Sequence, residues 1–224
     1  MIRRIVVAGA SRGIGAAVAA HFSARGDEVI SLSRGTAPHG RWLSVDLAEA
    51  ARISALPDRI GGRVDALLYT GGIWEDGAFT DAYRFTASPP DEAKRVIAVN
   101  LTAPILLTQA LLPLMPAGGR VVFIGSLSGL DNTASPEVAN SASKYGLRGA
   151  AQALAKTLHP LGIGVGVINP GNVATDEVLS DISEGRFDDQ VPIPMSDLLS
   201  AFDFALALTP ASVATEINLA QMRG

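Results

Sequence analysis

Residues 5–15 read Ile5-Val6-Val7-Ala8-Gly9-Ala10-Ser11-Arg12-Gly13-Ile14-Gly15, and the chain continues as Ala16-Ala17-Val18-Ala19-Ala20-His21-Phe22. The apolar, mostly β-branched start predicts a buried parallel strand, and the alanine-rich part predicts a helix. Glycine lets the backbone approach a pyrophosphate, and a helix N-terminus offers free N–H groups to it. A strand, a glycine turn and a helix in this order therefore predict a nucleotide-binding loop; an ordinary tight turn is the alternative.

Composition limits the classes of protein to which the chain can belong. It has 224 residues, of which 48% are hydrophobic and 18% charged, and a net charge of −4. These values predict one domain with a substantial core. The acidic balance argues against a nucleic-acid partner, because no basic cluster is longer than Arg3-Arg4. We find no apolar run of the ~18–20 residues that span a bilayer, and so expect no membrane segment.

Cysteine and histidine usage bears on metals and on the cellular compartment. The chain has no cysteine and three scattered histidines, which predicts no disulfide and no metal site. Residues 1–5 lead directly into the first strand, so we expect no cleavable signal. A cytoplasmic protein is the resulting expectation.

Strand-like and helix-like segments alternate along the whole chain. The expected strands are Ile5–Ala8, Glu28–Ser33, Arg41–Val45, Ala66–Tyr69, Arg120–Ile124, Gly164–Ile168 and Glu216–Leu219. The expected helices are Gly13–Arg25, Glu49–Leu56, Pro90–Met115, Ala139–Leu161 and Ser196–Ala207. Parallel strands need helical crossovers, so this order predicts an α/β fold of the Rossmann type. We expect a doubly wound parallel sheet of about seven strands, with helices on both faces, in a single domain over 1–224.

The end of the second expected strand indicates which dinucleotide binds. An acidic residue at that point would hold the ribose hydroxyls of NAD, whereas a basic one would accept the 2′-phosphate of NADP. The strand ends in Arg34, and Arg12 lies in the glycine loop, so two guanidinium groups favour NADP(H) over NAD(H). Solvated surface arginines are the alternative. Asp46, which follows the third strand, either contacts the adenine edge or caps the next helix.

Further polar and glycine residues follow the central strands, at the edge where such sheets bind ligands. Gly71-Gly72 comes after the fourth strand, and Ser126 with Ser128 after the fifth. Asn100 lies inside an apolar helix, where a buried amide needs partners. It either makes structural hydrogen bonds, holds a water near a site, or does both.

The motifs together resemble the short-chain dehydrogenase/reductase family over nearly the whole chain. Ala8–Gly15 is similar to the family's TGxxxGIG loop, with Ala8 in place of threonine, and Asn169–Thr175 is similar to its PGxVxT segment. Tyr69-Thr70-Gly71-Gly72 stands where the family usually has NNAG. Asn100 and Ser126 match the active-site asparagine and the catalytic serine.

The resemblance implies a set of cofactor-binding residues. They are Gly9, Ser11, Arg12, Gly13, Ile14, Gly15, Arg34, Asp46, Leu47, Gly71, Gly72, Lys144, Pro170, Gly171, Val173 and Thr175. The dinucleotide-binding loops would lie mainly in 1–125, and the catalytic helix and the substrate lid in 126–224. It also implies a homodimer or homotetramer formed through the helices 90–115 and 139–161.

One family motif is broken. The family pattern is YxxxK, and Lys144 is present, but Asn140 replaces the tyrosine. In the family the phenol exchanges a proton with the substrate oxygen, and the lysine lowers the phenol pKa. A carboxamide is a poor general acid. The implied catalytic set is therefore Ser126, Lys144, Asn100 and Asn140, without the usual proton donor.

Other groups are weighed as proton donors. Tyr145 lies five residues after Asn140, roughly 140° away around a helix, and is expected to pack against a neighbour or a partner subunit. Tyr69 lies at the mouth of the crevice, from where its side chain could project into it. Two serines and two loop carboxylates remain as weaker candidates: Ser126, Ser128, Asp131 and Glu137.

The segment 176–195 matches the family's substrate lid and carries an acidic run of Glu177, Asp181, Glu184, Asp188 and Asp189. A solvated acidic face is one interpretation; facing the crevice, the run would disfavour anionic substrates. The first hypothesis for function is an NADP-dependent oxidoreductase acting on a carbonyl or alcohol with an atypical proton route. The second is a catalytically impaired dinucleotide-binding sensor or partner subunit. The third is a cyclase or isomerase without net redox chemistry.

Overall fold

Seven parallel strands form one sheet in the computed structural model, which describes residues 2–185 and 190–222. The strand order is β3-β2-β1-β4-β5-β6-β7. The bounds are β1 Arg4–Ala8, β2 Glu28–Ser33, β3 Arg41–Ser44, β4 Ala66–Tyr69, β5 Arg120–Ile124, β6 Gly164–Pro170 and β7 Glu216–Leu219. Val6 of β1 pairs with Ile30 of β2 on one side and Leu67 of β4 on the other. The strand order reverses direction at β1 and β4, where such sheets form a crevice at the carboxyl ends.

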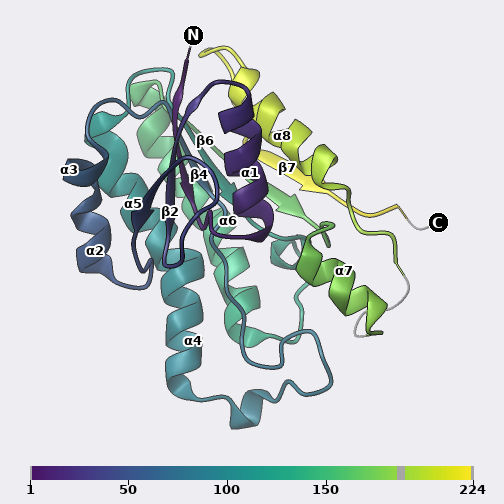
Figure 1. Cartoon of the computed structure of the whole chain (residues 1–224). Helices are drawn as coiled ribbons and strands as arrows, with labels where there is room; N and C mark the ends of the chain where they lie inside the picture. The colour runs from purple at the N-terminus through teal and green to yellow at the C-terminus, as the bar shows by residue number, and fades with distance from the viewer. Residues whose placement is uncertain (1, 186–189, 223–224) are drawn as a thin grey trace.

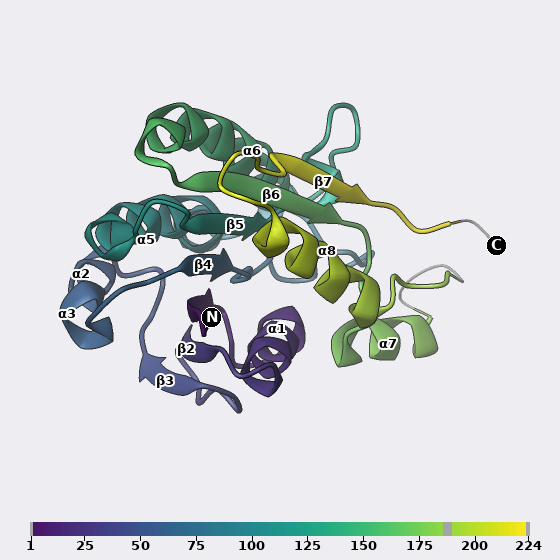
Figure 2. The same ribbon diagram turned by 90° about the horizontal axis from the view of Figure 1, so that it is seen from above.

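Helices cover both faces of the sheet, as Figure 2 shows from above. They are α1 Gly13–Ala24, α2 Ala50–Ser54, α3 Leu56–Ile60, α4 Pro90–Ile97, α5 Ala103–Leu111, α6 Val138–Leu158, α7 Asp176–Ser183 and α8 Met195–Ala207. One buried cluster contains Val6 and Leu67 and packs under α2, α3, α5 and α6; the other contains Ile5 and Leu68 and packs under α1 and α8. The central strands are therefore apolar on both faces, and the expected doubly wound α/β fold is confirmed.

Two expected helices differ in detail. The segment 49–56 forms two short helices, α2 and α3, because Pro57 near the start of α3 disfavours a continuous helix through the residues before it. The segment 90–115 is interrupted by a π-helical turn, Ala98–Thr102, between α4 and α5. The segment 176–195, which was expected to be a lid, begins with α7, a helix that the sequence pattern did not reveal.

The expectation that no apolar segment is long enough to span a bilayer is wrong. Among the described residues, the helical stretch Pro90–Leu114 has the length and composition to do so. It includes α4, the π turn and α5, and 44% of its most apolar window is buried inside the protein. This burial is typical of a core helix in an α/β domain, and such a helix can have the same length and apolar composition.

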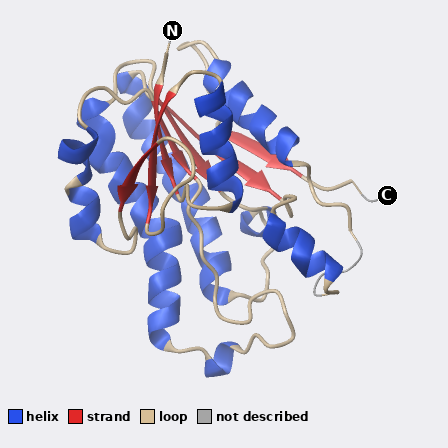
Figure 3. Ribbon diagram, in the orientation of Figure 1, coloured by secondary structure: helices blue, strands red, loops and turns tan. Residues whose placement is uncertain are grey.

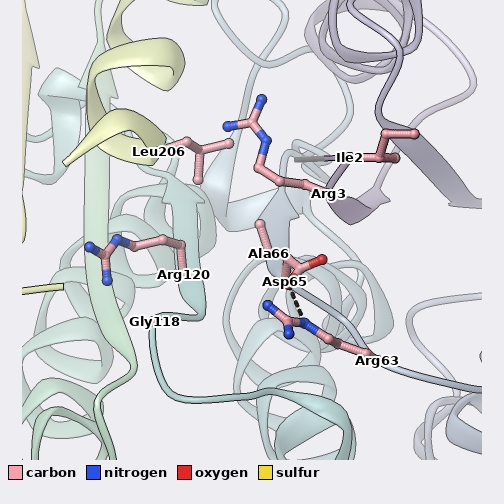
Figure 4. Close-up of a pocket in the computed structure, with 8 residues that line it drawn as sticks. All are labelled: Ile2, Arg3, Arg63, Asp65, Ala66, Gly118, Arg120 and Leu206. Carbon is pink, nitrogen blue, oxygen red and sulfur yellow. Dashed lines mark hydrogen bonds and ion pairs between the residues drawn. The ribbon is translucent and has the colours of Figure 1, made fainter. Parts of the chain in front are cut away.

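The strands point in one direction, so their amino ends share one edge of the sheet (Figure 3). That edge contains a cavity of about 320 Å³ lined by Ile2, Arg3, Arg63, Asp65, Ala66, Gly118, Arg120 and Leu206 (Figure 4). Arg63 pairs with Asp65 at 2.5 Å, and Arg3 pairs with Asp27 outside the cavity. Arg120 is 6% exposed and donates to the carbonyls of residues 208, 209 and 212. These guanidinium groups are used within the chain, so we assign this edge a structural role.

Candidate active site

The glycine loop after β1 is packed against the loop after β4. Gly9 has a φ of +89°, and a Cβ there would lie 2.5 Å from Gly71 Cα. A Cβ on Gly15 would overlap Gly9 O and lie 2.6 Å from Thr70 Oγ1. Only glycine fits at these two positions, so the backbones approach as closely as a phosphate cradle requires.

The start of α1 is available to an anion. Arg12 is its N-cap residue, with an extended backbone, no side-chain cap and no acidic residue in the first turn. The first N–H groups of a helix then carry unsatisfied donors and the positive end of the helix dipole. Ser11, Gly13 and Ile14 lie at least partly exposed at this turn. The residues fit a pyrophosphate at this point.

The two arginines expected to favour NADP(H) are both exposed. Arg12 forms an ion pair with Glu177 at the start of α7. Arg34 follows β2, and its charge is among those that lower the pKa of Asp46. Burial raises that pKa, but hydrogen bonds from Ala48 N and Arg95, with the charges of Arg95 and Arg34, lower it overall. Arg34 therefore lies within electrostatic reach of the loop after β3.

Asp46 does not cap the next helix. Its Oδ1 accepts from Ala48 N at 2.9 Å, whereas Glu49 is the N-cap residue of α2. The helix-capping alternative is thus wrong, because the carboxylate closes a turn three residues before the cap. Leu47, the next residue, is 8% exposed, and its Cδ1 would lie 3.2 Å from a Cβ on Gly71.

Asn100 lies in the π-helical turn and fixes the loop after β4. Its Oδ1 accepts from Ile73 N at 2.9 Å, and its Nδ2 donates to Ile73 O at 2.8 Å. The same Nδ2 contacts Ser143 Oγ on α6 at 3.3 Å. The structural hydrogen-bonding interpretation of Asn100 is therefore confirmed. π-Helical turns of this kind are frequent at functional sites.

Ser126 and the Lys144 ammonium group both lie near the carboxyl end of β5. Ser126 Oγ accepts from Ser128 N at 3.1 Å and from Ser128 Oγ at 2.9 Å. Lys144 is 8% exposed, and its Nζ donates to Ile124 O at 3.3 Å. A Cβ on Gly72 would lie 3.9 Å from this Nζ. The structure thus places the lysine beside the second loop glycine and on the carbonyl of Ile124, two residues before the serine.

Burial lowers the pKa of Lys144 to about 8, from an ordinary value of 10.5. As the pH rises, Lys144 loses its proton at a lower pH in the folded chain than in the unfolded chain. Between about pH 8 and pH 10.5 the unfolded chain therefore binds more protons than the folded chain. Stability should therefore rise with pH across this range, by about 3 kcal/mol at most. Urea unfolding at pH 7 and pH 10 should show the rise in the wild type and not in Lys144→Met. The exposed Lys156→Met should keep it; an equal rise in both variants would contradict the assignment.

Asn140 lies one helical turn before Lys144 and is 2% exposed. Within the described part of the chain, its side-chain Oδ1 has no hydrogen-bond partner. The first turn of α6 is held by a residue that sequence reasoning missed: Glu75 Oε1 accepts from Ala139 N at 2.7 Å and from Asn140 N at 3.2 Å. Glu75 thus caps the helix from a distant loop. The only signal for it is an acidic residue close after the Gly71-Gly72 pair.

Neither tyrosine considered as a proton donor points into the site. Tyr69 is fully buried, its hydroxyl donates to Val99 O at 2.6 Å, and burial raises its pKa. The expectation that Tyr69 projects into the crevice is wrong, because the side chain packs inward under the helices. The Tyr145 hydroxyl donates to Leu130 O, in agreement with its expected packing against a neighbour.

The two loop carboxylates lie in opposite environments. Asp131 has an 86% exposed side chain and pairs with Arg148 at 3.4 Å. Glu137 is 2% exposed, and its Oε1 accepts from Phe79 N at 2.7 Å. Glu137 is therefore folded inward, but its carboxylate accepts a hydrogen bond from the loop 73–89 and holds that loop in place.

The turn after β6 completes the edge. Thr175 caps α7 through Val178 N, and its Cγ2 would lie 3.9 Å from a Cβ on Gly13. Val173 is buried and bridges to Ile193. Pro170 ends β6, and Gly171 donates its N–H to Leu219 O at 2.9 Å. Asp188 and Asp189, which belong to the expected lid, lie outside the described residues.

This geometry can be compared with known proteins. A family model described as short chain dehydrogenase matches residues 3–184. The chain belongs to the short-chain dehydrogenase family.

Individual relatives of this family are similar over most of their length. A cyclic-di-GMP-binding biofilm dispersal mediator protein of Escherichia coli (strain K12) is 31% identical over 182 residues, which cover 78% of this chain and 74% of that protein. The 3-oxoacyl-(acyl-carrier-protein) reductase FabG of the same organism is 30% identical over 204 residues, which cover 84% and 81%. A short chain dehydrogenase from Burkholderia cenocepacia J2315, solved in complex with NADP, has a TM-score of 0.82 and 26% identity, and the match covers 97% and 96%.

Proposed function

We propose that this short-chain dehydrogenase is an NADP(H)-dependent oxidoreductase that acts on a carbonyl or alcohol without a tyrosine at position 140. The observation that supports the proposal is the position of Lys144, which bonds Ile124 O two residues before Ser126 and lies next to Gly72, in the loop that Asn100 fixes through Ile73. A protein that only binds a dinucleotide has no need of Ser126 together with Lys144.

The residues present fit the cofactor. Donors at the start of α1 face the place where a pyrophosphate would lie, and Gly9 and Gly15 leave no room for a side chain. Arg12 and Arg34 would hold the 2′-phosphate, and Lys144 the nicotinamide ribose. When bound, NADPH supplies a hydride. Relatives above 25% identity that were solved with NADP support this choice of dinucleotide.

The chain's own residues have separate roles around the reacting carbonyl. Ser126 would donate a hydrogen bond to the substrate oxygen from the end of β5. Lys144, with its lowered pKa, carries its charge below about pH 8 and places it beside that oxygen. Asn100 holds the loop after β4 against α6, which keeps Gly72 close to Lys144.

The test is the affinity for the two dinucleotides. Arg34→Ala should weaken NADPH binding about 10- to 100-fold and leave NADH binding unchanged, because a charge-assisted hydrogen bond contributes about 1.5–3 kcal/mol. Titration calorimetry measures both affinities. Arg63→Ala, at the opposite edge of the sheet, is the matched control and should change neither. Equal binding of NADPH and NADH by the wild type would contradict the cofactor choice, and binding of neither would overturn the proposed function.

The second candidate function is a dinucleotide-binding sensor or partner subunit, and Asn140 in place of tyrosine favours it.

Association of two copies through α5 and α6 also stays a proposal. It is supported by Ile105, 36% exposed on α5, and by the shallow cavity along α6 that includes Ala151 and Ala155.

A further inference from the structure

The turn 73–79 descends from the carboxyl end of β4 and passes the start of α6 before α4 begins (Figure 1). Two site residues fix it. The Asn100 side chain binds both the N–H and the carbonyl of Ile73, and Glu75 binds the amide of Asn140. Trp74 stands between these two anchors and is 45% exposed. Its ring is therefore outside the core, on a turn that is fixed to two residues of the candidate site.

Phe79 closes the same turn in a strained conformation. Its φ is +62°, in the left-handed region that a bulky residue rarely adopts. The N–H of Phe79 donates to the buried Glu137 Oε1 at 2.7 Å, which holds the backbone there. The Phe79 and Trp74 rings meet edge to face, with centroids 6.0 Å apart and planes at 73°. Phe79 is 38% exposed, so this strain serves to present a ring rather than to bury one.

Charge around the turn restricts what the rings contact. Glu75 and Glu137 are buried behind the turn, and each has one carboxylate oxygen without a hydrogen-bond partner within 2–185 and 190–222. The lid helix α7 begins with Asp176 and Glu177. An anionic ligand at the turn would lie near the buried carboxylates of Glu75 and Glu137, whereas a neutral apolar ring would contact Trp74 and Phe79 without a charge to bury.

We propose that Trp74 and Phe79 form an aromatic wall that binds the planar apolar end of a neutral aryl ketone or the corresponding alcohol. This inference rests on the proposed function, since it names the substrate class of the same site. Aromatic rings prefer edge-to-face or offset contacts with another ring, which should favour an aryl over an equally sized alkyl ligand about 3- to 10-fold.

The test uses a background in which Trp74 is the only tryptophan. The chain has two tryptophans, so Trp42→Phe provides it. Acetophenone is titrated against cyclohexyl methyl ketone in the presence of NADP, with Trp74 fluorescence as the readout. We expect acetophenone to change the fluorescence and to bind about 3- to 10-fold more tightly than the saturated ketone.

Variants separate recognition from folding. Phe79→Gly should abolish the preference for the aryl ketone while it leaves the melting temperature nearly unchanged, because glycine adopts the +62° backbone freely. Phe79→Ala should also abolish it but lower the melting temperature. Phe85→Ala removes a 63% exposed ring from the same loop and should keep the preference. The proposed aryl-binding role of Trp74 and Phe79 would be contradicted if the preference for the aryl ketone survives in Phe79→Gly. It would also be contradicted if the fluorescence responds to protein concentration and not to ketone. NADPH binding, measured separately, tests the proposed function independently.

Discussion

Asn140→Tyr is expected to raise kcat for NADPH-dependent reduction of a carbonyl about 100-fold or more. A positioned general acid contributes roughly 10²–10⁴-fold, and the asparagine amide does not titrate usefully. The new phenol would lie one helical turn before Lys144, whose charge would lower the phenol pKa toward the working range. Initial rates with a panel of aryl ketones and β-keto esters measure the gain. The gain in kcat should decline above about pH 8, where Lys144 loses its proton.

Asn140→Phe is the matched control for this substitution. It fills the same volume with a ring but has no hydroxyl, so it should give no gain over the wild type. Equal rates for the tyrosine and phenylalanine variants would mean that shape, not proton transfer, limits turnover. A wild type that binds NADPH without turnover, beside an active tyrosine variant, would favour the sensor or partner-subunit function.

The sheet and the glycine cradle were predictable because their signals are local. Apolar runs fixed the strands: β2, β4, β5 and β7 have the predicted bounds. The segment 49–56 was expected as one helix but forms α2 and the start of α3. Pro57, the second residue of α3, disfavours a continuous helix, and this effect also acts locally. The lid helix α7 was missed because its acidic residues indicate a solvated surface as readily as a helix.

The environment of position 140 was less predictable, because it depends on contacts between distant segments. Glu75 caps α6 across 64 residues, and no sequence pattern links the two. The burial of Tyr69 is different, because the alternation of side chains along a strand would have predicted it. Tyr69 lies two residues after Leu67, so both side chains share one face of β4, and Leu67 belongs to the core under α2, α3, α5 and α6. The interpretation of Tyr69 as projecting into the crevice was based on the loop after it and not on the strand that contains it.

Gly15→Ala is expected to weaken NADPH binding about 100-fold or more. The added Cβ would overlap Gly9 O and lie 2.6 Å from Thr70 Oγ1, so backbone must move. Gly9 has little room to do so: its N–H donates to Leu32 O at 2.8 Å, and its Cα side is packed on Gly71. The substitution would therefore shift the glycine loop after β1 and the loop after β4 together, which should lower the free energy of unfolding by about 1–3 kcal/mol. Calorimetric titration with NADPH and urea unfolding measure the two effects.

Gly149→Ala gives this prediction its control. Gly149 lies inside α6 at an exposed position, and a Cβ there meets nothing within 4 Å. Alanine is the better helix former by about 1 kcal/mol, so this variant should be at least as stable as the wild type and bind NADPH equally well. An unchanged NADPH affinity in Gly15→Ala would mean that the cradle tolerates a side chain and that the dinucleotide binds elsewhere. Loss of affinity in Gly15→Ala alone, with the folded state intact, would place the pyrophosphate between β1 and α1, where the packing of Gly9 on Gly71 leaves room for backbone only.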